Sequence, residues 1–365
     1  MWAWGTSQTV RNEQIAEMRE TMLRETYRLE PESHQNIHGA CQRAMLALGI
    51  DAPVTLYQAG GNEMNASLCF IPGEILIVLL GPMVERLDED ELVALFGHEL
   101  AHYQLWSSFN GEFYAANSIL DHALAYADAS ASLIETNRLF RLHTEIYADR
   151  GAAVAVGGIE PAIKLLLKTT KSIAKPDAQA YLRQAAEIES RATGSKGESH
   201  PEVFLRVQAL DKWWRIEAGG ENWIKNRILG PMSLSSLDLM RQIDLTNLTQ
   251  SYLLELLQDS SLRTDAVLTE IKTLFPQWPE GVKRLNPDAL SQTHCDQSIG
   301  EYLIAISFDM AMADLDVRDD ILSAGARAVA HIGSVEDYKT ALKRDLKLSK
   351  SVIDRIIANA NRAQR

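Results

Sequence analysis

Residues 87–106 read LDEDELVALFGHELAHYQLW, and this stretch decides how the first half of the chain is expected to fold. Asp88 stands three residues before Glu91 and just ahead of an apolar run, which is the arrangement of a capping box. It predicts that a helix begins at about Glu89 and extends to about Trp106. The pentapeptide HELAH lies inside this helix, so its side chains are held at helical spacing.

HELAH matches the pattern HExxH, whose chemistry depends on that spacing. Positions i and i+4 share one face of a helix, so His98 and His102 can reach the same cation, with Glu99 beside them as a candidate base. Two histidines supply only half of a tetrahedral zinc site, and a catalytic zinc has a third protein ligand and leaves the fourth position for water. Glu145, on a later helical segment, is the candidate third ligand. Asp149 follows one turn later and could accept a hydrogen bond from a ligating histidine.

Each of these assignments has a simpler alternative. A five-residue pattern can arise by chance on a solvated helix face, and Glu145 taken alone is better explained as an exposed helix glutamate. The capped helix, its apolar residues Leu95, Phe96 and Leu100, and the downstream carboxylate together favour the metal site.

The periodicity of the sequence changes on both sides of the quoted helix. Helical spacing over residues 8–48, interrupted by Pro31, is followed by three short segments with strand character that turns separate. These segments are residues 54–57, 64–71 and 74–80, and they predict a small antiparallel sheet. Helical sequence dominates the remainder of the chain.

We therefore expect an α+β fold in which a mostly helical domain with a small antiparallel sheet precedes an all-α domain. The expected divisions are a first domain over residues 1–230, helical connecting structure over 231–287, and a compact helical domain over 288–365.

The composition disfavours several classes of protein. A net charge of −13 over 365 residues disfavours nucleic acid and bare anionic lipid as partners. The three cysteines are sparse and form no CxxC pair, which fits a reducing compartment. We find no secretory signal and no apolar run of the roughly 20 residues that a membrane span needs. We therefore expect a soluble, cytoplasmic protein.

Four motifs occur in the order in which a known family carries them. They are Asn65-Ala66 ahead of Pro72-Gly73, the sequence from Leu87 that leads into His98–His102, Glu145 with Asp149, and His200-Pro201 followed by Arg206 and Leu210. Over about residues 54–210 the chain resembles the HtpX-like and CAAX-prenyl-endopeptidase group of gluzincin zinc metallopeptidases, of the M48 type.

The resemblance implies a zincin-like fold, one Zn²⁺ per chain, and hydrolysis of peptide bonds in peptides or proteins. It makes Glu99 the catalytic base and Glu145 the third ligand, and it gives His200 the role of stabilising the oxyanion. The alternative for His200 is an ordinary loop histidine. We add the hypothesis that Arg206 pairs with Asp149.

A peptide substrate is expected to bind extended, adding a strand along the edge near Asn65, Ala66 and Ser67. Backbone pairing tolerates many sequences, so no cleavage preference follows. Cys69 stands in the same segment, where it either approaches the metal or, as we favour, packs as a small apolar residue.

Two parts of the chain qualify the resemblance. Many relatives span membranes, but residues 115–134 are interrupted here by charged side chains that do not suit lipid, so prenylated substrates are not implied. The C-terminal region weakly resembles the TerB-type helical domain through FDMA at 308–311 and ADLDV at 313–317. Leu315 replaces the glycine usual in that family, and we favour an acidic surface loop over a metal site there.

Two functions of different class remain open. The first is an active zinc-dependent endopeptidase, latent or regulated through its helical C-terminal part. The second is a catalytically silent, zinc-bearing scaffold whose C-terminal helices dock a regulatory partner. The intact Glu99 favours the first, because a silent scaffold needs no base.

Overall fold

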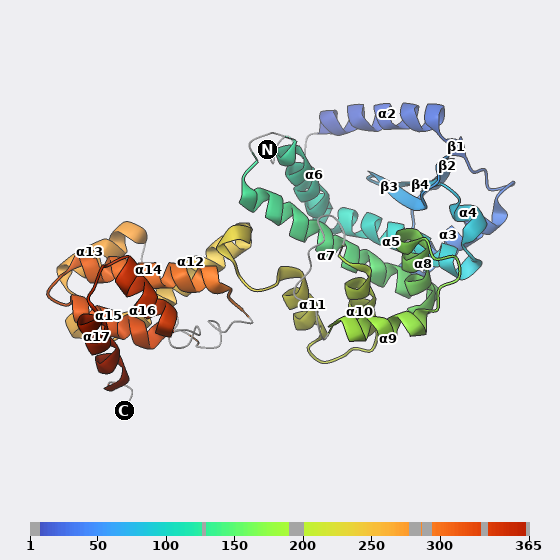
Figure 1. Cartoon of the computed structure of the whole chain (residues 1–365). Coiled ribbons are helices and arrows are strands. Elements are labelled where there is room, and N and C mark those ends of the chain that lie inside the picture. The colour runs from blue at the N-terminus through green and yellow to red at the C-terminus, as the bar shows by residue number, and fades with distance from the viewer. Residues whose placement is uncertain are drawn as a thin grey trace. The chain divides into compact units, whose positions relative to one another are not determined.

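The computed structural model describes residues 8–125, 129–189, 201–276, 286, 294–329 and 335–362, with side chains from residue 15 onward. The chain divides into two compact units, Met1–Leu229 and Gly230–Arg365. Figure 1 shows a small sheet among helices in the first unit and helices in the second. The predicted α+β class is therefore confirmed.

The sheet has four strands, β1 (Tyr27–Arg28), β2 (Val54–Ala59), β3 (Asn65–Ile71) and β4 (Glu74–Leu80), in the order β1-β2-β4-β3. β2 and β4 are parallel and the other neighbours are antiparallel, so the prediction of an antiparallel sheet was wrong in this respect. The cause lies in β4, whose interior is a continuous buried apolar run that suits a central strand. β3 returns beside β4 as a hairpin, and β2 occupies the other side of β4 and runs in the same direction.

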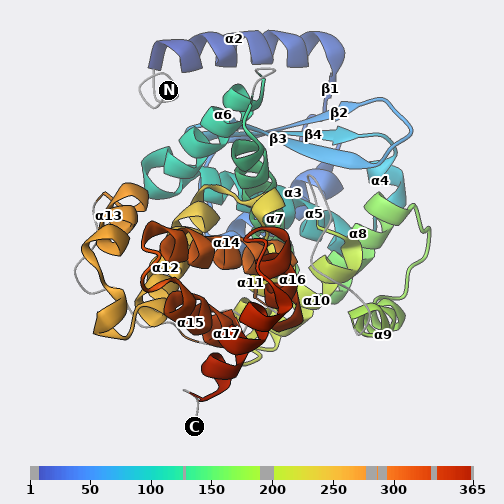
Figure 2. The same ribbon diagram turned by 60° about the vertical axis from the view of Figure 1, so that its left-hand side comes forward.

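Helices pack on both faces of this sheet. One face joins α3 (Gln35–Leu48), α5 (Glu89–Ser107) and α7 (Ala131–Val156) in the main hydrophobic core. On the other face, Tyr57 and Val78 pack with Met18 and Met22 of α2 (Gln8–Glu25). Figure 2 shows α2 across the sheet on the side away from α5. Cys69 belongs to this outer cluster, where it packs as a partly buried side chain.

α5 begins with the capping box that the sequence predicts. The Asp88 carboxylate accepts a hydrogen bond from the Glu91 amide at 2.9 Å, and the Glu91 carboxylate accepts one from the Asp88 amide at 2.9 Å. Glu91 is also bound by Lys168 of α8 (Glu160–Lys171) at 2.6 Å. The start of the helix that carries HELAH is thus fixed by side chains from two elements.

Two glycines allow α5 and α7 to approach closely. A Cβ atom on Gly97 would lie 2.8 Å from the carbonyl oxygen of Gly151, and a Cβ atom on Gly151 would lie 2.3 Å from the Cβ of Ala101. Only a hydrogen atom fits at these positions, so the two helix backbones meet one residue before His98. This crossing brings side chains of α7 to the histidine-bearing face of α5.

The remaining helices of the first unit surround this crossing. They are α4 (Met83–Arg86), α6 (Glu112–Leu124), α9 (Ala178–Glu189), α10 (Val203–Trp214) and α11 (Gly220–Leu229), with a 3-10 turn η1 (Ser108–Gly111) after α5. Among the helices described in either unit, none is both long and apolar enough to cross a lipid bilayer.

The second unit is built around one hydrophobic core. Its helices are α12 (Leu239–Leu256), α13 (Asp265–Leu274), α14 (Gln297–Ala313), α15 (Arg318–Val329), α16 (Val335–Arg344) and α17 (Lys350–Arg362), with short turns η2 (Leu234–Ser236) and η3 (Ser260–Leu262). α12 and α13 fall in the segment expected to be connecting structure, yet they share the core of the later helices. The TerB-like character of residues 288–365 stays a prediction.

Candidate metal centre

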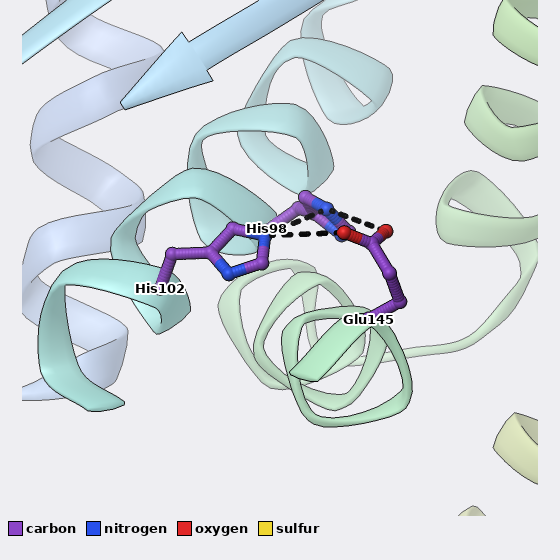
Figure 3. Close-up of side chains that lie close together, drawn as sticks. All are labelled: His98, His102 and Glu145. Atoms are coloured by element: carbon purple, nitrogen blue, oxygen red, sulfur yellow. Dashed lines mark hydrogen bonds and ion pairs between the residues drawn. The ribbon is translucent and has the colours of Figure 1, made fainter. Parts of the chain in front are cut away.

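Three side chains from α5 and α7 converge on one point (Figure 3). The Nε2 atoms of His98 and His102 are 3.3 Å apart. Glu145 places its carboxylate oxygens 3.6 Å from Nε2 of His98 and 3.8 Å from Nε2 of His102. Among the residues that the structure describes, these three form the group of potential metal ligands whose atoms lie within 4.8 Å of one another.

This geometry fits a tetrahedrally coordinated divalent cation. Two ligand atoms bound to zinc at 2.0–2.1 Å with a tetrahedral angle are about 3.3 Å apart, which is the separation of the two imidazole nitrogens. Two imidazoles and one carboxylate are a donor set that zinc uses in catalytic sites, where a fourth position stays open. The ligands line a cleft, so that fourth position would face space accessible to a substrate.

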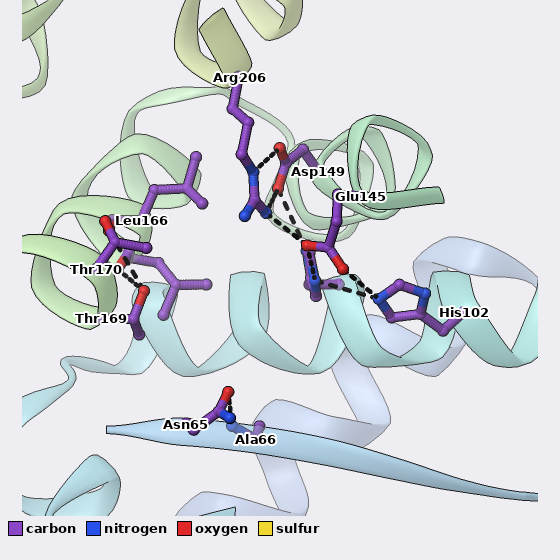
Figure 4. A network of polar contacts seen from close by, with 11 residues as sticks. Asn65, Ala66, His102, Glu145, Asp149, Leu166, Thr169, Thr170 and Arg206 are labelled. Carbon is purple, nitrogen blue, oxygen red and sulfur yellow. Dashed lines mark hydrogen bonds and ion pairs between the residues drawn. The ribbon is translucent and has the colours of Figure 1, made fainter. Parts of the chain in front are cut away.

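A second layer of polar contacts lies behind the three side chains (Figure 4). Nδ1 of His98 is 3.3 Å from the Asp149 carboxylate. Arg206 of α10 binds Asp149 through Nε at 2.7 Å and through its terminal nitrogen at 2.5 Å, and it lies 3.2 Å from Glu145. The bidentate pair fixes the carboxylate that in turn orients His98.

The comparison with known families matches residues 31–214 to peptidase family M48. The chain belongs to this family. The plastoglobule-localized metallopeptidase 48 of Arabidopsis thaliana, a chloroplast protein, is 28% identical over 203 residues, which cover 49% of this chain and 57% of that relative. The match thus spans little more than half the length of the relative.

The buried charges of this M48 site shift the pKa values of the two histidines in opposite directions. Burial lowers the pKa of His98, but the hydrogen bond to Asp149 and the nearby carboxylates outweigh it and hold the pKa above its usual value. Burial and the charge of His98 lower the pKa of His102 to about 4, so His102 is neutral at pH 7. These directions reflect the protein's own charges, and a bound cation would oppose protonation of both rings.

Glu99 faces the same cleft and is almost fully buried, with 6% of its surface exposed. Burial raises the pKa of its carboxyl group, His98 opposes the shift, and Glu145 adds to it. A carboxyl group with a raised pKa accepts and returns a proton more readily near neutral pH than an exposed one.

The cleft has a volume of about 650 Å³ and runs between two walls. One wall is the start of β3, including Asn65, Ala66 and Ser67. The opposite wall comes from α8, through Leu165, Leu166, Thr169 and Thr170. His98, His102, Glu145 and Glu99 also line it.

The sequence-predicted residues fall into three groups in the structure. The candidate metal ligands, Glu99 and the β3 residues line one cleft, while Asp149 forms a contact behind it with Arg206, which also reaches the cleft. His200 lies outside the described residues. Sequence reasoning missed the α8 wall and Trp106, since α8 reads as an ordinary amphipathic helix and no motif marks either as part of a site.

Proposed function

We propose that the chain is a zinc-dependent endopeptidase. The observation that carries the proposal is the convergence of His98, His102 and Glu145 in a cleft that has Glu99 on its surface and a strand edge along one wall. Family membership and the name of the Arabidopsis thaliana relative support a metal-dependent hydrolase. The zinc ion, the residue roles and the peptide substrate are our proposals.

Each residue of the site has a separate proposed role in the reaction. A zinc ion held by the three ligands would supply Lewis acidity, which acidifies a water molecule and polarises the scissile carbonyl. Glu99 takes the proton from the attacking water and returns it to the leaving amine. Arg206 and Asp149 hold His98 and Glu145 in place throughout, because both are buried and paired. We keep His200 as the proposed oxyanion donor.

The open edge of β3 favours an extended polypeptide as substrate. The Ala66 amide donates to the side-chain oxygen of Asn65 at 3.0 Å, so it points away from β4. Outward groups alternate along an antiparallel strand, so the Leu68 amide faces the same edge, where it also opposes the rise in the pKa of Glu99. A substrate strand would pair with the Ala66 amide after displacing the Asn65 side chain, while the Leu68 amide remains bound to Glu99.

The test combines metal content with cleavage of an unfolded protein such as casein. We expect about one zinc per chain in wild type and in Glu99→Gln, with cleavage lost in Glu99→Gln. Glu145→Ala should lose both zinc and cleavage. Glu112→Gln, on an exposed position of α6, is the matched control and should resemble wild type.

Three outcomes would contradict parts of the proposal. Undiminished cleavage by Glu99→Gln would remove Glu99 as the base. Stoichiometric zinc without cleavage in wild type would favour the silent scaffold. Absence of zinc from protein supplied with it would contradict the metal site itself.

We also propose the cytoplasm as the compartment of this protein. The support is chemical: Cys41, Cys69 and Cys295 are all free thiols in the structure. The plastoglobule named for the Arabidopsis thaliana relative is a property of that protein. Fractionation of cells that express a tagged chain would test the proposal, and recovery with a membrane or organelle would contradict it.

A further inference from the structure

Three rings stack in a row beside the proposed metal site. Trp106 lies one turn after His102 on α5, and its ring is 6.2 Å from the imidazole, with 19° between the planes. The ring of Phe140 in α7 is 6.1 Å from the same indole, with 17° between the planes. Near-parallel rings at these separations are offset stacks, which hold the orientation of both partners.

The two histidines differ in what holds their rings. Nδ1 of His98 contacts Asp149, which is itself fixed by Arg206. Within the described part of the chain, no residue forms a hydrogen bond with Nδ1 of His102. Its ring instead has the flat face of Trp106 on one side and its Nε2 directed at His98. Metal-binding imidazoles usually need an outer contact that fixes the ring, and here that contact is aromatic.

We propose that Trp106 is a positioning residue that orients His102 for the metal. The inference rests on the proposed function, because it requires that His102 is a ligand. The indole face limits rotation of the imidazole, so Nε2 keeps facing the point shared with His98 and Glu145. Phe140 stacks on the indole and helps to hold it in place.

The stack also links the two helices that supply the ligands. His102 and Trp106 belong to α5, whereas Phe140 lies on α7, five residues before Glu145. A shift of α7 along α5 would therefore disturb the rings and the carboxylate together. The close glycine contact fixes the crossing point of the helices, and the stack fixes a second point near the ligands.

Trp106 also packs against the main core, so the experiment has to separate packing from positioning. The full-length chain is prepared as wild type, Trp106→Leu, Trp106→Phe and Phe140→Leu. Trp214→Leu is the control, because Trp214 is an exposed indole of the same unit that contacts the Trp213 ring at a tilted angle and does not line the cleft. Zinc affinity is measured by competition with a chromophoric chelator, and the visible absorption of the Co²⁺ form reports ligand geometry. Thermal unfolding in chelator reports packing alone.

We expect Trp106→Leu to weaken zinc affinity about threefold to tenfold, the effect that an aromatic pair of ordinary strength supports. Its Co²⁺ absorption should change in shape. Trp106→Phe keeps a ring against His102 and should restore most of the affinity. Phe140→Leu should give a smaller loss in the same direction, and Trp214→Leu should give none.

Three results would overturn the inference, and they are distinguishable. If wild type binds zinc and Trp106→Leu binds it equally well with an unchanged Co²⁺ spectrum, Trp106 only packs, and the proposed function stands. If wild type binds no zinc, the proposed function fails and the inference fails with it. Should Trp106→Leu fail to fold, equal affinity and spectra in wild type, Trp106→Phe and Phe140→Leu would overturn the inference.

Discussion

In the first unit two buried charged side chains pair with each other beside a cleft, whereas in the second unit a buried arginine binds backbone groups. Asp149 and Arg206 are 3% and 4% exposed and pair with each other next to His98 and Glu145. Arg241 in the second unit is similarly buried, but it donates to the carbonyl oxygens of Gly230 and Pro231.

This difference distinguishes a functional site from structural packing. Burying an ion pair is costly unless its geometry is good, and replacing it with apolar residues is often harmless to stability. A cluster of buried charges at a cleft is therefore better explained by a role in binding or catalysis than by a contribution to stability. The burial of Arg241 is explained by the hydrogen bonds that it donates to backbone carbonyl groups around it.

The largest expected effect comes from removing Arg206. Arg206→Leu leaves Asp149 buried without its partner, and we expect a loss of about 3–5 kcal/mol in the free energy of unfolding. Arg241→Leu leaves two carbonyl groups without a donor and should cost about 1–3 kcal/mol. Urea unfolding measures both. Zinc affinity should fall only in Arg206→Leu, and an equal fall in Arg241→Leu would contradict the distinction between the two units.

A pair of glycines gives the next comparison. Gly151→Ala forces a methyl group against Ala101 and the backbone of Gly97, and we expect a loss of about 1–3 kcal/mol together with weaker zinc binding. In the second unit, Gly325→Ala meets the Tyr338 hydroxyl at 2.5 Å and the Ser307 hydroxyl at 3.0 Å, so it should destabilise without affecting zinc. Thermal unfolding and chelator competition measure the two effects. Unchanged zinc affinity in Gly151→Ala would show that the helix crossing does not set the ligand geometry.

The sequence predicted the parts of the site that lie on one element and depend on local rules. The capping box and the i, i+4 histidines need only helical spacing, and both are present in α5. Glu145 was a candidate from the sequence that the family resemblance supported, and Arg206 came from the resemblance alone, since nothing local reveals that α7 and α10 meet α5. The pairing of β2 with β4 escaped prediction because strand order depends on which strand is central. The α8 wall and the Trp106 stack arise from packing between elements, for which the sequence carries no short pattern.

Acid should affect the two units through different carboxylates. Burial raises the pKa of Asp149, but Arg206 and His98 outweigh it, so the pKa lies below its usual value. Such a group adds stability above its unfolded pKa of about 3.9, and this stability is lost as the pH falls through the lower folded pKa. In the second unit, burial raises the pKa of Asp296, but hydrogen bonds from Ser233 and Ser298 outweigh it and hold the pKa below its usual value.

Asp149→Asn should therefore reduce the loss of stability of the first unit as the pH falls from 5 to 2. Asp296→Asn should do the same for the second unit. The urea midpoints of unfolding over this pH range measure both effects. The first substitution should also weaken zinc binding at pH 7, because His98 loses its carboxylate partner. If Asp149→Asn lost as much stability as wild type between pH 5 and pH 2, the lowered pKa of Asp149 would be contradicted.

The smallest expected effects come from two helix caps of the same type. Asp88 caps α5 and Asp238 caps α12, each by accepting from a backbone amide three residues later. Replacing either by alanine should cost about 1 kcal/mol, since the cap bond is the same. α5 carries two of the three proposed metal ligands, whereas α12 carries none of the three. His98 and His102 lie about three and four turns from Asp88, so fraying at the cap should leave zinc affinity within about twofold of wild type. A larger loss of zinc affinity in Asp88→Ala, with none in Asp238→Ala, would show that the whole of α5 acts as one rigid support for the site.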